Sequence, residues 1–436
     1  MKNIHNIIIV GAGLAGCEAA WQAANRGVSV TLYEMKPNKM SPAHKSEHFA
    51  ELVCSNSLRA DGLHNAVGLL KEEMRKFGSL IIEAADATRV PAGGALAVDR
   101  EGFSAYVTDK IKNHPNITVV HEEICGIPLN SPTIIAAGPL ASDTLADSIA
   151  KLTDDEHLHF FDAAAPIVTK ESVDFSRAFF GARYGKGDDD YINCPMTRAE
   201  YLEFWNNLIA AELAPLNENV DKPNVFEGCM PVEVMAKRGE DTLRFGPLKP
   251  VGLIDPRAAD TDPRPYAVVQ LRQDNAAGTL YNLVGFQTQL TFGEQKRVFS
   301  LIPALANAEF VRFGVMHRNT YINSPKLLDN TFKFKDGLYF AGQITGVEGY
   351  VESASSGLLA GINAANEMLG KSPLILPRIT AMGALAEYIS NGAIANFQPM
   401  NINFGIMESI QIRNKKEKAL EISKRSLNFL EKYVRI

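Results

Sequence analysis

The sequence has few cysteines, almost no tryptophan and no long hydrophobic run, and these shortages exclude several classes of protein. Its 436 residues include 5 cysteines and 2 tryptophans. The cysteines stand apart and never form Cys-x-x-Cys, which disfavours a structural zinc site or a disulfide framework and favours a reducing compartment. No apolar stretch approaches the roughly 18 residues that a membrane-spanning helix needs. We therefore expect a cytoplasmic protein with no metal centre and no membrane anchor.

Charge is distributed unevenly along the chain. The formal net charge is −6, and the 46% hydrophobic and 22% charged residues are ordinary for a globular protein. The segment from Gln411 to Ile436, however, holds eight Lys or Arg against three Glu. Leu420, Leu427 and Leu430 give this basic tail an amphipathic helical spacing. The tail is therefore either a solvated terminal helix or a helix that contacts phosphates.

The N-terminal segment has the pattern strand, glycine turn, helix, strand. Residues 6–10 form a short β-branched run, residues 16–25 a small-residue helix, and residues 28–33 a second strand. In such a G-x-G-x-x-G turn the first glycine permits a tight bend, the second lets a pyrophosphate approach, and the third lets the helix pack on the strand. The N–H groups at the start of the helix then face the phosphates. The residues of the turn are Gly11, Ala12, Gly13, Leu14, Ala15 and Gly16.

An acidic residue stands where a dinucleotide site needs one. Glu34 follows the second predicted strand, and a carboxylate at this point can accept hydrogen bonds from ribose hydroxyls. An acid also favours an unphosphorylated ribose, as in FAD or NAD, over the phosphorylated ribose of NADP. The sequence therefore predicts a dinucleotide-binding site.

A late segment favours FAD over NAD. Residues 337–343 have the pattern of a strand that ends in Ala-Gly, similar to the second flavin-contacting signature of FAD oxidoreductases. Many of those enzymes have Asp where this chain has Gln343. The Gly- and Ser-rich residues that follow predict a helix whose N-terminus faces the flavin and favours its reduced anion. We therefore expect Gly342 and Gln343 to lie near a flavin.

The middle of the chain differs from both ends in its sequence pattern. The strand signals at 133–137 and 338–341 fit the same sheet as the N-terminal strands, although almost 200 residues separate them. Between them, short strand signals alternate with many Pro and Gly residues. We expect an α/β fold in which an FAD-binding Rossmann-like domain of the glutathione-reductase type, residues 1–151 and 325–436, carries an inserted α+β domain, residues 152–324.

Two cysteines stand in contexts that favour reactivity. Cys229 precedes Pro231, the predicted start of a helix that ends at Gly239, and a helix N-terminus lowers the pKa of a thiol. Cys54 precedes a cluster of polar capping residues. A small buried side chain remains the alternative for each, and it is the expectation for the other three cysteines. A disulfide reductase would also combine flavin and thiols, but such enzymes normally hold two cysteines close in sequence.

Seven blocks of sequence together resemble one family. They begin at Gly11, Leu52, Pro91, Phe226, Arg244, His317 and Ala341. The chain resembles the folate- and FAD-dependent tRNA (uracil-5-)-methyltransferases, the TrmFO family, which are smaller relatives of the GidA tRNA-modification proteins. The resemblance extends from about residue 4 to about residue 366 and is weakest in the basic tail.

The resemblance implies an enzyme that forms 5-methyluridine at position 54 in the T-loop of tRNA. The carbon comes from 5,10-methylenetetrahydrofolate, and the electrons come from NADH or NADPH through FAD. The resemblance implies that Cys229 adds to uracil C6 and that Cys54 is an auxiliary cysteine near the flavin. Aromatic and basic side chains interleave in a set of five residues, Phe310, Arg312, His317, Arg318 and Tyr321. Of these, His317, Arg318 and Tyr321 are the candidates for binding RNA or folate.

Three alternatives remain open at this stage. The same chemistry could act on a uridine of 23S ribosomal RNA. The protein could instead be an NAD(P)H-dependent flavin oxidoreductase, although paired cysteines and a second G-x-G-x-x-G are missing. An RNA-binding protein or chaperone could also hold FAD in a purely structural role. The sequence does not identify the base that removes the C5 proton, since Glu227 and Glu233 are near Cys229 only in sequence.

Overall fold

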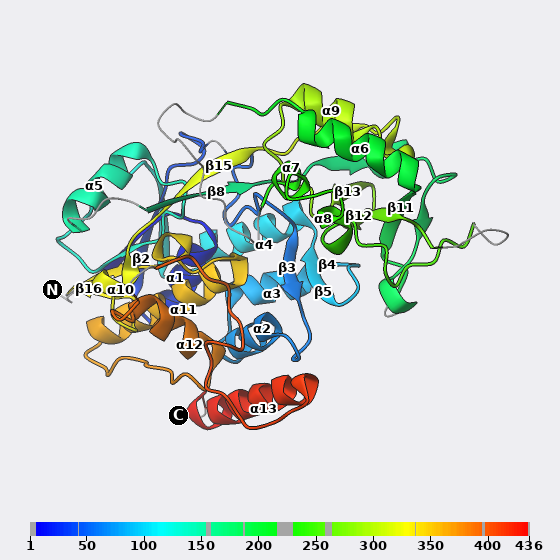
Figure 1. Cartoon of the computed structure of the whole chain (residues 1–436). Helices are drawn as coiled ribbons and strands as arrows, with labels where there is room; N and C mark the ends of the chain where they lie inside the picture. The colour runs from blue at the N-terminus through cyan, green and yellow to red at the C-terminus, as the bar shows by residue number, and fades with distance from the viewer. Residues whose placement is uncertain are drawn as a thin grey trace.

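The computed structural model describes residues 6–41, 43–153, 158–185, 188–215, 230–257, 264–335, 337–394 and 397–434. Figure 1 shows the two ends of the chain gathered in one half of the molecule and the middle of the chain in the other. None of the helices in these ranges is long and apolar enough to cross a membrane.

The first half of the molecule is built on a six-stranded sheet in the order β16-β17-β7-β1-β2-β6. All neighbouring strands are parallel except β16 and β17. Because parallel strands end at the same edge, the residues that follow β1, β2, β7 and β17 meet there, where α/β sheets bind their ligands. The strands are β1 (Asn6–Val10), β2 (Ser29–Glu34), β6 (Ile117–His121), β7 (Thr133–Ile135), β16 (Lys333–Lys335) and β17 (Leu338–Phe340).

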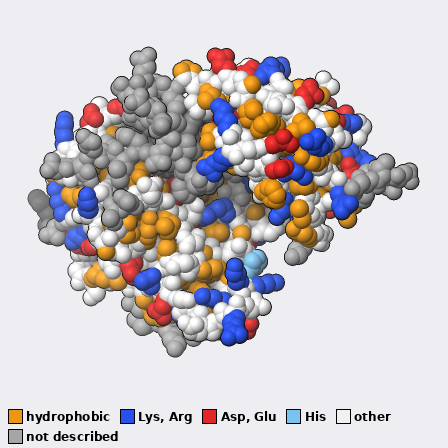
Figure 2. Space-filling view, viewed as in Figure 1, with side chains coloured by type: hydrophobic (Ala, Val, Ile, Leu, Met, Phe, Trp, Pro, Cys, Tyr) orange, Lys and Arg blue, Asp and Glu red, His pale blue; other side chains and the backbone are white. Residues whose placement is uncertain are grey.

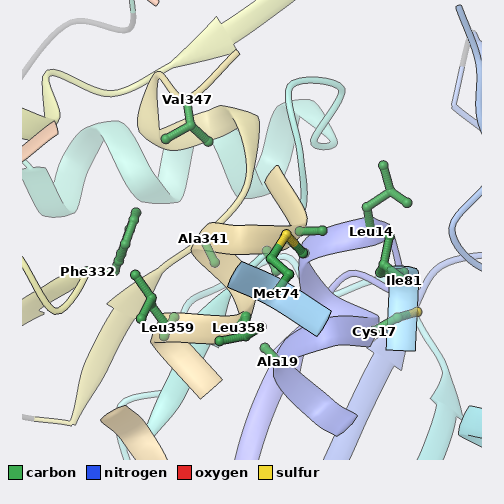
Figure 3. Packing of buried hydrophobic residues seen from close by; sticks show 14 of the residues in the cluster. Leu14, Cys17, Ala19, Met74, Ile81, Phe332, Ala341, Val347, Leu358 and Leu359 are labelled. Atoms are coloured by element: carbon green, nitrogen blue, oxygen red, sulfur yellow. The ribbon is translucent and has the colours of Figure 1, made fainter. Parts of the chain in front are cut away.

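Two helices from opposite ends of the chain pack against each other beside this sheet. They are α1 (Leu14–Asn25) and α11 (Tyr350–Met368), and both are rich in Ala and Gly. A Cβ atom on Gly357 would lie 2.1 Å from the carbonyl oxygen of Ala15, and one on Gly361 would lie 2.5 Å from that of Ala19. The two helices therefore touch backbone to backbone, and Figure 3 shows the surrounding cluster of buried side chains.

Further helices complete this half of the molecule, together with a small three-stranded sheet in the order β3-β5-β4. The strands are β3 (Ser57–Ala60), β4 (Arg89–Val90) and β5 (Ala95–Val98). The helices are α2 (Ala66–Lys76), α3 (Leu80–Ala87), α4 (Arg100–Lys112), α5 (Asp143–Thr153), α10 (Ser324–Leu327), α12 (Ala381–Ser390) and α13 (Lys415–Val434).

The middle of the chain forms a second six-stranded sheet, antiparallel throughout, with its own hydrophobic core. A separate pair, β8 (Leu158–Ala163) and β15 (Met316–Tyr321), begins and ends this region. The sheet contains β9 (Ile167–Thr169), β10 (Phe179–Phe180), β11 (Tyr191–Met196), β12 (Ala267–Gln273), β13 (Leu280–Leu283) and β14 (Phe310–Arg312). The helices are α6 (Arg198–Ala210), α7 (Val232–Ala236), α8 (Thr242–Phe245) and α9 (Phe292–Phe299).

The expected fold class, a Rossmann-like α/β sheet with an inserted α+β region, is confirmed. The division at residues 151/152 and 324/325 stays a prediction. Two helix boundaries differ from the sequence prediction. Helix α1 begins at Leu14 because Gly13 takes an extended conformation as its N-cap. Helix α7 is shorter than the predicted span to Gly239, since Lys237 already ends it.

The basic tail is a docked helix rather than a fully solvated one. Helix α13, red in Figure 1, packs against α2 through a face that includes Ile422, Ser426 and Leu430. The Ser423 hydroxyl also donates a hydrogen bond to the carbonyl oxygen of Leu63, at 2.7 Å. One face of α13 is therefore committed to the fold, while its lysines at 415, 416 and 424 are exposed.

Buried Glu73 joins three of these helices. Its carboxylate, on α2, accepts hydrogen bonds from the N–H groups of Ala381 at 2.7 Å and Met382 at 2.8 Å, which begin α12. It also accepts a hydrogen bond from the hydroxyl of Ser426 on α13. Glu73 is 0% exposed, and burial raises its pKa to about 7 despite these donors. The packing of the tail is thus linked to the protonation of one carboxyl group.

We predict that replacing Glu73 with Gln removes part of the pH dependence of stability. The folded-state pKa of about 7 lies above the ordinary value of 4.5, so the folded state binds the proton more tightly. This contribution is complete below pH ~4.5 and is lost as the pH rises towards ~7. The free energy of unfolding by urea should fall over this range in the wild type and fall less in Glu73→Gln. The surface variant Glu72→Gln is the control, and identical pH profiles for wild type and Glu73→Gln would contradict the linkage.

Candidate functional site

A long pocket opens where the parallel strands end. It encloses about 1110 Å³ of space, its open mouth included. Residues from both ends of the chain line it. Those used below are Gly11, Ala12, Gly13, Leu14, Ala15, Glu34, Val53, Gly342, Gln343 and Tyr350.

The three positions of the N-terminal turn are occupied by glycine for different structural reasons. Gly11 has φ +100°, and a Cβ there would lie 2.6 Å from the carbonyl oxygen of Ala136. A Cβ on Gly16 would lie 1.8 Å from the carbonyl oxygen of Gly11. A Cβ on Gly13, in contrast, would meet no atom within 4 Å. The fold therefore requires Gly11 and Gly16, while Gly13 keeps the pocket side of the turn clear.

The start of α1 adds donors to this cleared space. Gly13 is the N-cap of α1 and provides no side-chain cap. The first N–H groups of a helix have no partners within the helix, and together with the helix dipole they favour an anion. This arrangement suits a pyrophosphate group, as the spacing predicted.

The carboxylate of Glu34 stabilises the glycine turn by a hydrogen bond. One carboxylate oxygen accepts a hydrogen bond from the N–H of Ala12 at 2.8 Å, and the other accepts one from the N–H of Lys36 at 2.9 Å. Glu34 is 7% exposed and lines the pocket. Since each carboxylate oxygen can accept two hydrogen bonds, the side chain can still bind ribose hydroxyls. Its contact with Ala12 is a second role that the sequence did not reveal.

The turn after β17 lies against the start of α1. Gly342 has φ +87°, and a Cβ there would lie 3.1 Å from that of Ala15. Its N–H donates to the hydroxyl of Ser356 at 2.7 Å, and the amide of Gln343 donates to Glu348 at 2.7 Å. The structure thus brings the predicted cofactor residues together around one pocket, with Gly16 packed beneath the turn. Their role in binding a ligand stays a prediction.

The loop that carries Cys54 ends at this pocket. The phenol oxygen of Tyr350 accepts hydrogen bonds from the N–H groups of Cys54 at 2.8 Å and Ser55 at 3.2 Å. Burial raises the pKa of Tyr350 well above its ordinary value, so the phenol is neutral at physiological pH. Cys54 is half-buried, and its neighbour Val53 lines the pocket. The structure therefore places the backbone of Cys54 against Tyr350, a residue that lines the pocket.

Arginines from the middle of the chain hold the Cys54 loop. Arg312, at the end of β14, donates to the carbonyl oxygen of Val53 at 2.8 Å. Arg272, on β12, donates to the hydroxyl of Ser55 at 2.6 Å and to the side chain of Asn56 at 3.2 Å. Burial lowers the pKa of both guanidinium groups. Arg312 was among the basic residues that the sequence offered for RNA or folate, not for holding this loop. Arg272 was missed, although a basic residue within the apolar strand at 267–273 was a signal.

A third arginine reaches the loop from α4. The guanidinium of Arg100 donates to the carbonyl oxygen of Leu52 and forms an ion pair with Asp274 at 2.9 Å. Cys54 lies within electrostatic reach of both Arg100 and Arg272. Three guanidinium groups therefore surround the loop, and Asp274 balances the charge of one of them.

Cys229, the predicted nucleophile, lies outside the described residues, and its role stays a prediction. The chain is described again from Met230. Glu233, one of the two acids near Cys229 in sequence, is 0% exposed and accepts hydrogen bonds from the hydroxyl of Thr288 at 2.9 Å and the N–H of Gln289 at 2.8 Å. Glu233 therefore attaches α7 to the segment that contains Thr288 and Gln289, which favours a structural role for Glu233.

The other three cysteines do not all follow the expectation of burial. Cys17 and Cys194 are buried, and burial raises the pKa of both thiols. Cys125 is exposed, because it lies in the loop that follows β6 rather than in the sheet. The expectation was wrong for Cys125.

The predicted RNA and folate residues on β15 fall into two groups. His317 and Arg318 pair through their backbones with Asp162 and Phe161 of β8, and their side chains lie outside the described part of the structure. Tyr321 is only 2% exposed, and its ring meets that of Phe397 edge-on at 6.1 Å. The end of β15 enters the main core, so the ring of Tyr321 offers no open face for stacking.

Comparison with solved structures defines the class of protein. The fold is similar to that of Aquifex aeolicus GidA, with a TM-score of 0.71 and 18% identity over 99% of this chain and 73% of that chain. A second crystal form of the same protein gives the same TM-score of 0.71. The chain also matches the family described as "Glucose inhibited division protein A" over residues 6–372. The fold is therefore that of a GidA-like flavoprotein.

Sequence comparison narrows the class to one family. The chain is 62% identical to a protein of Acetivibrio thermocellus named methylenetetrahydrofolate–tRNA-(uracil-5-)-methyltransferase TrmFO, over 99% of both chains. It is 59% identical to the protein of that name from Listeria monocytogenes, over 98% of both chains. The chain belongs to the TrmFO family, as the sequence blocks indicated.

We predict that Gly13→Val abolishes retention of FAD without unfolding the protein. The added side chain would meet no protein atom at its Cβ, so it fits the fold but fills the space that a pyrophosphate needs. The absorbance of the purified variant should show loss of flavin, while its circular dichroism and thermal midpoint match those of apoprotein prepared from wild type. Gly94→Val is the control, since a Cβ there also meets nothing within 4 Å. A normal flavin content in Gly13→Val would refute the site.

Proposed function

We propose that this protein methylates C5 of a uracil in tRNA and forms 5-methyluridine at position 54 of the T-loop. The carbon donor is 5,10-methylenetetrahydrofolate, the cofactor is FAD, the reductant is NADH or NADPH, and the reaction takes place in the cytoplasm. The observation that carries the proposal is the glycine-lined pocket with the Cys54 loop at one end, in a chain 62% identical to a protein named for this reaction.

The described residues of the pocket fit FAD. The cleared side of the turn at Gly13 and the N-terminus of α1 would hold the pyrophosphate, and Glu34 would bind the ribose of the adenosine. Gly342, Gln343 and the start of α11 would face the flavin. When bound, the flavin supplies the redox chemistry that this chain's own side chains lack.

The target carbon must be activated before it can accept a methyl group. Uracil C5 is a poor nucleophile until a thiolate adds to C6. The new bond joins sulfur to C6, and the electron pair of the C5–C6 double bond moves towards the C4 oxygen, where nearby donors stabilise it. After C5 has bonded to the new carbon, a base takes the C5 proton. The electron pair of that C–H bond restores the C5–C6 double bond, and the sulfur–C6 bond breaks to release the thiolate. We assign the attack to Cys229 and an auxiliary role beside the flavin to Cys54.

Nucleoside analysis tests the function directly. Mass spectrometry of tRNA and of 23S ribosomal RNA from a strain that lacks this protein should show loss of 5-methyluridine from the tRNA alone. Loss from ribosomal RNA alone would move the substrate to that RNA. No loss from either, with flavin reduced by NAD(P)H in the purified protein, would favour a flavin oxidoreductase instead.

We predict that Cys229→Ser retains FAD and RNA binding but loses nearly all methylation. A serine hydroxyl stays protonated at neutral pH and cannot replace a thiolate in the attack on C6. A T-arm RNA with 5-fluorouracil at the target should form a covalent adduct with the wild type and with Cys54→Ser, and none with Cys229→Ser. An adduct that depends on Cys54 instead would reverse the two assignments.

We predict that the outer face of α13 contributes to RNA binding through charge alone. Lys415, Lys416 and Lys424 are exposed there, whereas Arg425 donates to the carbonyl oxygen of Glu408 and should be left unchanged. Replacing the three lysines with Ala should weaken binding of tRNA and reduce the slope of log K against log salt by roughly 0.7 to 0.9 per lost phosphate contact. An unchanged slope would return α13 to a purely structural role.

A further inference from the structure

Four phenylalanine rings form a continuous array from the core of the middle region to its surface. Phe299 is 0% exposed, while Phe292 at the outer end is 56% exposed. The ring centroids of Phe292 and Phe313 lie 5.1 Å apart with an interplanar angle of 17°, and those of Phe313 and Phe310 lie 5.7 Å apart at 12°. The ring centroids of Phe310 and Phe299 lie 6.5 Å apart. The outer three rings are therefore nearly parallel and end in solvent.

The exposed end of this array is rigidly held. Phe292 begins α9, whose N-cap Thr291 accepts a hydrogen bond from the N–H of Glu294. Gln295, fully buried on the same helix, accepts from the N–H of Gly314 and donates to its carbonyl oxygen, both at 2.8 Å. Helix α9 thus carries the ring of Phe292, and its Gln295 fixes the backbone next to Phe313. Such a pair is a preorganised flat surface and loses little freedom when another ring stacks on it.

The array is connected to the Cys54 loop through one residue, Arg312. Arg312 stands between Phe310 and Phe313 in the chain, and its guanidinium donates to the carbonyl oxygen of Val53 at 2.8 Å. Figure 2 shows hydrophobic, basic and acidic side chains intermixed on the half of the molecule that carries α6 and α9. An aromatic face close to basic side chains is the combination that binds unpaired bases of single-stranded nucleic acid.

We propose that the stacked pair Phe292–Phe313 binds one unpaired nucleobase of the RNA substrate, next to the uridine that reaches the Cys54 loop. The inference rests on the proposed function, because it requires RNA at this site. It assigns the stacking role predicted for Tyr321 to residues whose rings are accessible. A base extruded from a loop has lost its stacking partners, and the phenylalanine pair replaces one of them.

Binding of an unmodified T-arm stem-loop RNA to the FAD-containing protein tests this proposal. Phe292→Ala should weaken binding by about tenfold or more, the usual effect of removing one base–aromatic stack. Phe292→Trp should restore it. The slope of log K against log salt should not change, since the lost contact carries no charge. Phe245→Ala is the matched control, because Phe245 on α8 of the same region is 83% exposed.

A second probe locates the base itself. The fluorescent analogue 2-aminopurine, placed in turn at each loop position beside the target uridine, should show a signal on binding the wild type that Phe292→Ala abolishes at one position. Flavin content and thermal midpoint should stay the same in both proteins, as expected for an exposed side chain.

The outcomes separate this inference from the proposed function. If the wild type methylates RNA and Phe292→Ala binds RNA equally well, the inference is wrong and the function stands. If Phe292→Ala raises the KM for methylenetetrahydrofolate and leaves RNA affinity unchanged, the stack serves the pterin ring and the inference is again wrong. If the wild type neither binds nor methylates RNA, both are overturned.

Discussion

The backbone contact between α1 and α11 is the constraint on which the pocket depends. Any side chain at Gly357 or Gly361 would push the two helices apart, because the carbonyl oxygens of Ala15 and Ala19 occupy that space. The contact sets the turn at Gly342 against Ala15, so residues more than 300 positions apart in the chain line the same pocket. A rigid pocket assembled from distant segments needs such a short helix-to-helix distance, and only small residues permit it.

A second constraint positions the reactive loop. The Cys54 segment belongs to the half of the molecule that contains the pocket, yet Arg272 and Arg312 of the other half hold its carbonyl and side-chain oxygens. Burying guanidinium groups costs free energy unless hydrogen bonds compensate, and the hydrogen bonds to this loop provide part of that compensation. The middle region is therefore part of the site rather than an attachment to it. The position of Cys54 relative to the pocket depends on contacts between the two halves.

The sequence predicted what local patterns can encode. The glycine spacing and the β-branched runs predicted β1, α1 and β2 to within two residues, because each of these signals lies within the element that it defines. The hydrogen bond from Cys54 to Tyr350 joins residues 296 positions apart, and no local periodicity reports such a contact. Tyr321 shows the same limit. Alternating aromatic and basic residues predict a strand with two different faces, but the packing of β15 decides which face enters the core.

The two proposed RNA contacts differ in what they contribute. Exposed lysines on α13 would attract phosphates of any sequence, so they add affinity without fixing position. The Phe292–Phe313 stack would fix one base beside the Cys54 loop and adds no charge. Figure 1 places α9 and α13 at opposite edges of the molecule. An RNA that touches both must therefore extend across the protein, with the loop that enters the site at one end and helical phosphates at the other. A net charge of −6 is compatible with this arrangement, because the basic residues act where they are concentrated and not through the total charge.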